Sequence, residues 1–140
     1  MAEKLYREPT NYTPHISFDP TKQKFELSGV ARPEDTYDFF EPVLSWVEDY
    51  VKNIIETHEK SQLANETFLI IFNFKYINSS SSKYIFQIIT NFKKLLKRRL
   101  NVNIYWYYDD PDDQILEDGE DFSEIIDIPF KFISRNKDSL

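Results

Sequence analysis

Two short segments near the start of the chain alternate hydrophobic and polar residues, as strands with one buried face do. They are His15–Asp19 and Lys24–Val30, and this period of two residues predicts a pair of β-strands. The residues between them, Asp19 to Gln23, include Pro20 and are typical of a turn. Together they predict a β-hairpin.

Two longer segments repeat their hydrophobic residues every three or four positions, which predicts amphipathic helices. The first runs from Phe39 to His58. Because Pro42 has no backbone N–H to donate, we expect this helix to begin near it, after a short turn over residues 34–39. The second extends over Lys83 to Leu100, with its first turn beginning at about Ser81.

The remaining hydrophobic segments predict strands. Thr67–Ile77 is apolar on both faces over its first half, which is typical of a central strand covered on both sides. Val102–Tyr108 predicts a further strand, and Phe130–Ile133, which follows Pro129, predicts an edge strand. Residues 109–121 predict an acidic loop or a short helix.

The order of these elements predicts the fold class. Strand–helix–strand units favour right-handed parallel crossovers, and the hairpin adds an antiparallel pair. We therefore expect one small α/β domain, with a mixed four- or five-stranded sheet and helices packed on it. The expected core consists of Val47, Tyr50, Ile54, Phe68, Ile70, Ile71, Phe72, Phe74, Ile85, Ile89, Phe92 and Trp106.

Composition narrows the classes of protein that the sequence fits. A length of 140 residues suits one domain, and an aromatic content of 16% argues against disorder. The absence of Cys excludes disulfides and thiolate chemistry, and two Gly are too few for a glycine-rich phosphate loop. The polar start, Met1 to Tyr12, has no apolar leader, and no apolar stretch is long enough to cross a bilayer. We therefore expect a cytoplasmic protein without membrane insertion.

Acidic residues are concentrated in one segment of the chain. Residues 109–127 hold ten acids and no base, whereas the rest of the chain has 17 bases and 14 acids, and the net charge is −7. A nucleic-acid partner is not expected, because such proteins present a basic face. The five bases from Lys93 to Arg99 suit the C-terminal end of a helix, where cations complement the helix dipole.

No residue pattern indicates a catalytic centre, a cofactor or a metal site. His15 and His58 are the only histidines, and they form no metal-spaced pair. The acids do not have the spacing of a calcium loop. A domain that binds a small molecule or a divalent cation through residues 109–121, with Tyr107 and Tyr108, is the alternative function.

A run of four serines carries the clearest functional signal. Asn78-Ser79-Ser80-Ser81-Ser82-Lys83 joins the end of the expected central strand to the second helix, at the edge where open α/β sheets place functional loops. One serine suffices to cap the helix. Four hydroxyls also offer a phosphorylation site, where a phosphate adds about −1.5 to −2 charges beside the positive end of the helix dipole. The spacing alone leaves capping and phosphorylation open.

Four groups of segments, taken together, resemble a known family. The first three are Thr13–Asp19; Gly29–Asp35 with Phe39-Phe40-Glu-Pro42, Trp46 and Tyr50; and Asn78–Lys83. The fourth is Trp106–Asp113 with Gly119–Phe122. Together they resemble the SiaC family of bacterial regulatory phosphoproteins. In the order given, they are similar to the family's opening strand, to its Gly-x-Ser-x-Pro-Glu segment with the first long helix, to its Asn-Thr-Ser-Ser-Ser-Lys motif, and to its Trp-Tyr-Tyr and acidic stretch.

The resemblance implies a STAS-like fold and a signalling function without catalysis. It implies that a Ser/Thr kinase and a phosphatase act on the first hydroxyl after the motif's Asn, which in this chain is Ser79. The unphosphorylated form is then expected to bind and activate an effector, a diguanylate cyclase of cyclic di-GMP and biofilm signalling. Ser79 replaces the family's usual Thr, and Ala31 stands where the family often has Ser.

The resemblance also indicates the remaining boundaries and contacts. We expect residues 1–12 to be an N-terminal extension, residues 13–134 the regulatory domain and residues 135–140 a C-terminal tail. The hydroxyl of Ser79 should be exposed in a loop before the helix, with its phosphate held by backbone N–H groups of Ser81, Ser82 or Lys83. The candidates for partner binding are Arg32, Glu34, Tyr107, Asp109, Asp112 and Asp113.

Overall fold

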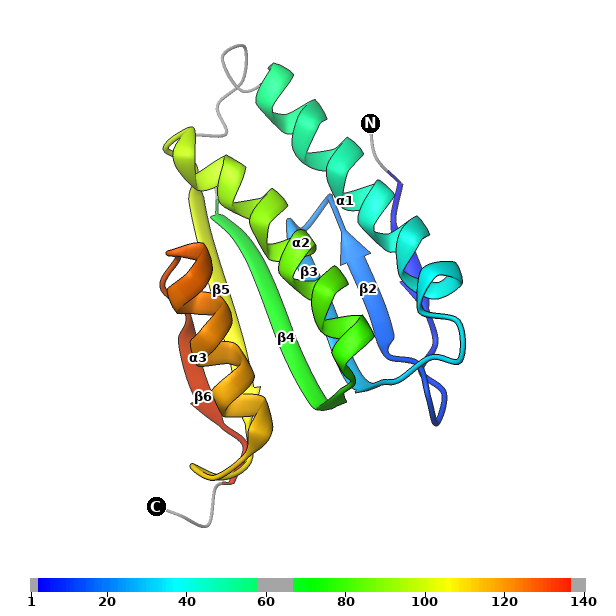
Figure 1. Ribbon diagram of the computed structural model, residues 1–140. Coiled ribbons are helices and arrows are strands. Elements are labelled where there is room, and N and C mark those ends of the chain that lie inside the picture. The colour runs from blue at the N-terminus through cyan, green and yellow to red at the C-terminus, as the bar shows by residue number, and fades with distance from the viewer. Residues whose placement is uncertain (1–2, 58–66, 137–140) are drawn as a thin grey trace.

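The computed structural model describes residues 3–57 and 67–136 (Figure 1). The elements along the chain are β1 (Leu5–Arg7), β2 (His15–Asp19), β3 (Lys24–Ala31), α1 (Thr36–Thr57), β4 (Thr67–Ile77), α2 (Ser79–Lys97), β5 (Asn101–Tyr108), α3 (Gln114–Ile126) and β6 (Lys131–Ser134). The expected end of the first helix at His58 and most of the C-terminal tail, residues 137–140, lie outside the described residues. No helix among the described residues is long and apolar enough to cross a membrane.

All six strands belong to one mixed sheet in the order β1-β2-β3-β4-β5-β6. β1, β2 and β3 are antiparallel neighbours, and β3 to β6 are parallel. The expected hairpin and edge strand are confirmed. The expected number of strands was too low, because Leu5–Arg7 pairs with β2 and three residues are too few to show a period of two.

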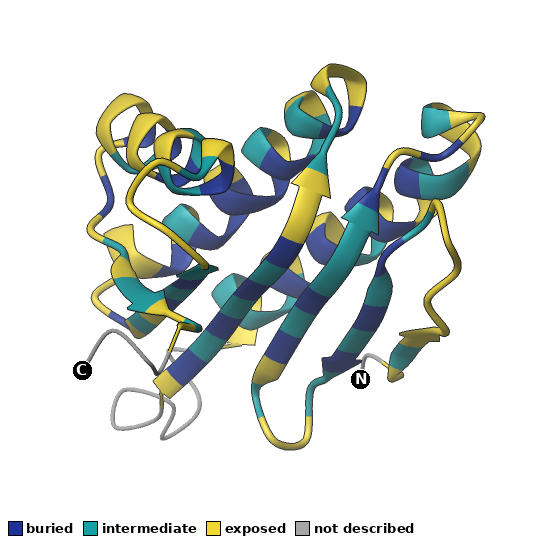
Figure 2. Ribbon diagram, turned by 90° about the horizontal axis from the view of Figure 1, so that it is seen from below, coloured by how far each residue is buried: buried dark blue, intermediate teal, exposed yellow. Residues whose placement is uncertain are grey.

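The three helices of the described chain cover one face of the sheet and leave the other uncovered (Figures 1 and 2). From β3 to β6, each strand pairs with the one before it, and the sheet grows toward the same edge. Because the connections between parallel strands are all right-handed, each helix then lies on the same face of the sheet. The expectation that β4 is covered on both sides is therefore wrong. Residues of β4 alternate between buried and half-buried positions, and Leu69 and Ile71 lie on the half-buried side.

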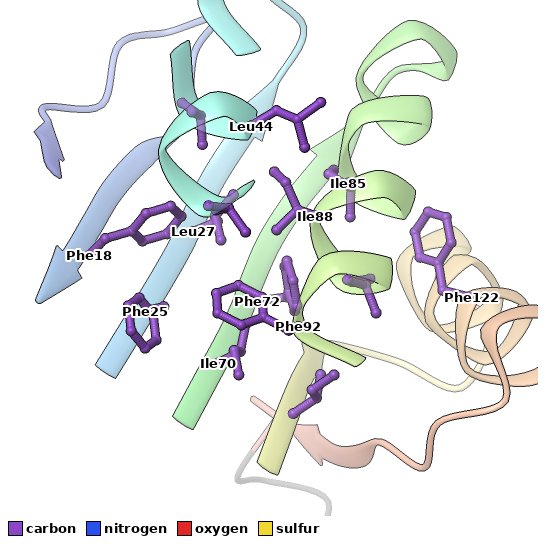
Figure 3. Close-up of a cluster of buried hydrophobic side chains, with 14 of the residues drawn as sticks. Phe18, Phe25, Leu27, Leu44, Ile70, Phe72, Ile85, Ile88, Phe92 and Phe122 are labelled. Carbon is purple, nitrogen blue, oxygen red and sulfur yellow. The ribbon is translucent and has the colours of Figure 1, made fainter. Parts of the chain in front are cut away.

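The core lies between the sheet and the helices (Figure 3). Ten of the twelve expected core residues are buried, whereas Ile54 and Ile71 are half-buried. Aromatic rings join the layers: Phe25 of β3 contacts Tyr50 of α1 and Phe92 of α2, with ring centroids 5.1 and 5.2 Å apart. These contacts fix both helices on the sheet.

Helix α1 begins earlier than its proline suggests. Asp35 caps it, because its Oδ1 accepts from the N–H of Asp38 at 2.9 Å and its carbonyl accepts from Phe39 at 3.2 Å. Pro42 lies inside the helix, so the expected start near Pro42 is wrong. Pro42 lies on an exposed face of the helix. Water can therefore hydrogen-bond the backbone carbonyl one turn earlier, which has no N–H of Pro42 to accept from.

A register shift in the sheet aligns the segments that follow β3 and β4. Gly29 has a φ of +97°, which favours glycine, and the pairing shifts between Gly29 and Val30. Beyond the shift, Ala31 pairs with Ile77, and its carbonyl accepts from the N–H of Asn78 at 2.9 Å. The end of β3 is thereby attached to the residue that precedes α2.

Candidate functional site

The first turn of α2 is organised by Asn78. Its Oδ1 accepts from the N–H of Ser81 at 2.9 Å, and its backbone carbonyl accepts from the N–H of Ser82 at 3.0 Å. Asn78 is therefore the N-cap, and the helix begins at Ser79, two residues before the expected start. Two of the N–H groups expected to hold a phosphate, those of Ser81 and Ser82, are already used. The N–H groups of Ser79 and Ser80 remain, at the positive end of the helix dipole.

The helical turn gives the four serines different environments. Ser79 is exposed, and its hydroxyl has no hydrogen-bond partner in the described part of the chain. The Ser80 hydroxyl pairs with Thr36 Oγ1 of α1 at 2.8 Å and lies 3.3 Å from Asn78 Oδ1. Ser81 is fully buried, and Ser82 is half-buried. Ser79 therefore has the accessible, uncommitted hydroxyl of the run, as expected, although it lies in a helix rather than in a loop.

The other candidates follow the carboxyl ends of neighbouring strands. Arg32 and Glu34 come after β3, Ser79 after β4, and Asp109 after β5, so the fold gathers them at the lower edge of the sheet in Figure 1. Glu34 and Asp112 are exposed and have no ion pair within the described residues. Arg32 lies over the ring of Tyr12, 5.1 Å from its centroid. Tyr107 is half-buried and alternates along β5 with the buried Ile104 and Trp106, so it lies on the sheet face opposite to them.

Two of the acidic candidates stabilise local structure. Asp109 forms a two-pronged ion pair with Arg135, with Nε–Oδ1 and Nη2–Oδ2 distances of 2.9 and 3.2 Å. Asp113 is the N-cap of α3, and it accepts from the N–H groups of Ile115 and Asp109, each at 3.1 Å. Residues 109–121 thus form a loop followed by the first part of α3, which Asp113 caps. The sequence had left open whether this segment is a loop or a short helix. Arg135 is attached to β5 by this pair.

A groove of about 650 Å³ lies between α2 and α3 and reaches Ser79. On α2 it is lined by Ser82, Lys83 and Phe86, and on α3 by Asp118 and Phe122. This groove was not predicted from the sequence. A signal was present, because Gln114, Asp118 and Phe122 recur every four residues and so share one face of a helix.

The residues described give no support to a cation site in the acidic segment. No group of three or more His, Asp or Glu side chains converges among residues 3–57 and 67–136. Of the ten acids in residues 109–127, only Asp113 and Asp118 are half-buried, and the rest are exposed. Exposed and dispersed carboxylates suit a docking surface better than a metal-binding cage.

Comparison with known families assigns the chain. The family described as SiaC family regulatory phosphoprotein matches residues 7–135. The chain belongs to the SiaC family. A relative, an uncharacterized protein of Pseudomonas aeruginosa strain UCBPP-PA14, is 27% identical over 126 residues, which cover 90% of this chain and 92% of that protein.

Solved structures of SiaC proteins from Pseudomonas aeruginosa have the same fold. Apo-SiaC is 24% identical, with a TM-score of 0.77, over 94% of this chain and 99% of that chain. A second SiaC structure is 25% identical, with a TM-score of 0.74, over 96% and 98% of the two chains. A third, also at a TM-score of 0.77 and 24% identity, over 94% and 99% of the two chains, is the complex of the diguanylate cyclase SiaD with its activator SiaC.

The groove gives this SiaC family chain one perturbed carboxyl group. Burial raises the pKa of Asp118, the hydrogen bond from Gln114 lowers it, and the charges of Asp121, Glu117 and Asp113 raise it, with the net effect upward. Because the folded-state pKa lies above the ordinary value of 3.8, this group favours folding below pH 3.8. That stability is lost as the pH rises through the folded-state pKa.

We expect Asp118→Asn to raise the free energy of unfolding at pH 7, by less than about 1 kcal/mol because the carboxylate keeps contact with water. At pH 3 the two proteins should be equally stable, since the wild-type carboxyl is then neutral. Thermal unfolding between pH 3 and pH 7 measures the difference, with Asp121→Asn as an exposed control. A variant that is less stable than wild type at pH 7 would contradict the prediction.

Proposed function

We propose that this chain is a non-enzymatic cytoplasmic regulator whose state is set by phosphorylation of Ser79. A partner kinase transfers the γ-phosphoryl group of ATP to Ser79 Oγ, which loses its proton, and ADP leaves. A partner phosphatase hydrolyses the phosphoester and releases inorganic phosphate. The unphosphorylated form binds and activates a diguanylate cyclase. Family membership supports the proposal, as does the SiaC fold seen in complex with a diguanylate cyclase.

The observation that carries this proposal is the position of the Ser79 hydroxyl. It is exposed in the first turn of α2, on the edge that also holds Glu34 and Asp112. A kinase needs such access to align a hydroxyl with the nucleotide phosphate. Once formed, the phosphate has the N–H groups of Ser79 and Ser80 and the positive end of the helix dipole to stabilise it. Serine in place of the family's threonine keeps the hydroxyl and removes one methyl group.

Phosphorylation inhibits binding without a change of fold in this mechanism. A dianion placed in a docking surface must lose water when the partner binds, and a buried charge without a partner costs several kcal/mol. A loss of about 2.8 kcal/mol weakens binding about a hundredfold. The switch therefore needs only the phosphate, and Ser79→Ala should remain folded and stay in the binding form.

The experiment uses the kinase and the diguanylate cyclase encoded in the same genome as this chain. Phosphopeptide mapping should place the phosphate on Ser79, and the phosphorylated chain should bind the cyclase about a hundredfold more weakly than the unphosphorylated chain. Ser79→Ala should bind and activate the cyclase whether or not the kinase is present. Ser79→Thr should be switched like wild type.

Ser80→Ala is the matched control, because it removes the neighbouring hydroxyl, which pairs with Thr36. This variant should still be phosphorylated and released. Phosphate found only on Ser80, Ser81 or Ser82 would refute the assignment of Ser79. Equal cyclase binding by the phosphorylated and unphosphorylated chains would refute the switch.

A further inference from the structure

The groove between α2 and α3 contains an apolar patch among lining residues that are mostly polar. Ile77 closes it at the end of β4, and Phe86 and Phe122 line it from the two helices. The rings of Phe86 and Phe122 lie 6.3 Å apart, centroid to centroid. Phe122 projects from α3 at the side of the main core cluster (Figure 3). An apolar side chain that entered the groove would be removed from water and would pack against these apolar side chains, which is favourable.

One wall of this groove carries a negative charge that the fold does not neutralise. Asp118 is half-buried there, and it accepts a hydrogen bond from Gln114 Nε2 at 3.0 Å. It has no ion pair within the described residues, and Glu117 and Asp121 add like charge from the same helix. Lys83, on the opposite wall, is exposed and does not pair with it. A cation brought beside Asp118 would therefore find a partly buried carboxylate that no ion pair compensates.

We propose that the groove receives a short segment of the partner protein, with an apolar side chain packed against Phe86 and Phe122 and a Lys or Arg beside Asp118. This inference rests on the proposed function, because the segment belongs to the protein that binds the unphosphorylated chain. Ser79 lies on the rim of the groove. A phosphate on Ser79 then obstructs the entrance with its volume and its bound water, so one modification controls one pocket.

The surrounding charge supports a basic occupant. Most of the ten acids in residues 109–127 are exposed, and they lie after β5 and in α3, the helix that forms one wall of the groove, where Asp118 is the acid that lines it. A basic segment gains both long-range attraction to this surface and a specific contact with Asp118. An acidic segment would be repelled by Asp118 and by the exposed acids of α3. The occupant that fits the groove therefore has an apolar residue, which packs on Phe86 and Phe122, next to a basic residue, which pairs with Asp118.

A small organic cation tests the pocket without any partner. Phenethylammonium carries an aromatic ring and an ammonium group, whereas 3-phenylpropionate carries a ring and a carboxylate. In an NMR titration, phenethylammonium should shift the amide signals of Phe86, Asp118 and Phe122 saturably, and 3-phenylpropionate should bind at least tenfold more weakly. Asp118→Asn should abolish this preference, and Asp121→Asn, on the exposed side of α3, should retain it.

A matched pair of substitutions shows whether the signals come from the groove. Ser82→Phe fills the groove and should abolish the shifts. Ser45→Phe makes the same change at an exposed position of α1 and should leave them unchanged. The inference fails if neither compound binds, if both bind equally, or if the shifted signals lie elsewhere. Amide spectra of the two variants establish that each one is folded.

Binding of the diguanylate cyclase then tests the biological role of the pocket. Ser82→Phe should weaken binding at least tenfold, and Ser45→Phe should bind like wild type. If the cyclase binds Ser82→Phe as well as wild type, the inference fails and the proposed function stands. If the cyclase does not bind wild type, the proposed function fails and so does the docking of a cyclase segment in the groove, whatever the NMR titration shows.

Discussion

Replacing Ile89 with Ala is expected to lower the free energy of unfolding by about 2–5 kcal/mol. Ile89 is fully buried on the side of α2 that faces the sheet. Removing its side-chain carbons beyond Cβ leaves a cavity that the surrounding residues fill only in part, because a close-packed interior relaxes little. Urea unfolding followed by circular dichroism measures the change.

The neighbouring Thr90 provides the control for this substitution. Thr90 is exposed on the same helix, and its hydroxyl donates to the carbonyl of Phe86 at 2.8 Å. Thr90→Ala should change the free energy of unfolding by no more than about 0.5 kcal/mol, since it leaves no cavity. A loss below about 0.5 kcal/mol for Ile89→Ala would show that this face of α2 does not pack on the sheet.

The hydrophobic pattern predicted the type of nearly every element but not the side of the sheet on which the helices lie. Ile71 and Ile54 are apolar and were expected in the core, and both are half-buried. Neighbouring strands shield Ile71 on the uncovered face, where no helix of the described chain lies. Periodicity identifies apolar positions, whereas strand order and crossover hand decide which of them a helix covers. Strand order is a property of the whole chain.

The candidate site was predictable where the signal was local. Asn78 and the serines stand together in the sequence, and Ser79 is exposed as expected. The choice of Asn78 over a serine as the cap was not predictable, because Asn and Ser cap helices equally well. Its selection depends on the extended backbone of Asn78 itself, at φ −82° and ψ 166°, directly after the end of β4. The groove depends on how α2 and α3 lie beside each other, which no local pattern encodes.

The internal contacts of Asp109 and Asp113 show a second limit of sequence reasoning. Both residues were named as candidates for partner binding, which stays a prediction, and the structure adds an internal contact for each of them that the sequence did not predict. Charge composition does not distinguish an acid that caps a helix from an acid that faces solvent, because both are hydrophilic. The distinction depends on Arg135, far along the sequence, and on where α3 begins.

Replacing Gly119 with Ala is expected to destabilise the fold, although the same change normally stabilises a helix by about 1 kcal/mol. Gly119 lies within α3, and a Cβ there would lie 2.5 Å from Trp106 Nε1 and 2.6 Å from Cδ1. Trp106 is fully buried, and its Nε1 donates to the carbonyl of Ile115 at 2.8 Å. Because the indole ring has no free space to move into, we expect a loss of about 2–3 kcal/mol in urea unfolding.

A double-mutant cycle with Trp106→Phe tests the cause of that loss. The phenyl ring has no Nε1 and none of the five-membered ring that the new Cβ would strike. Trp106→Phe alone should be destabilising, since it removes the hydrogen bond to Ile115 and part of the contacts with Phe72 and Phe130. In that background Gly119→Ala should cost less, which gives a coupling energy of about 1–3 kcal/mol. Additive losses, or a stabilising Gly119→Ala, would show that the contact between α3 and Trp106 does not limit how closely α3 approaches the sheet.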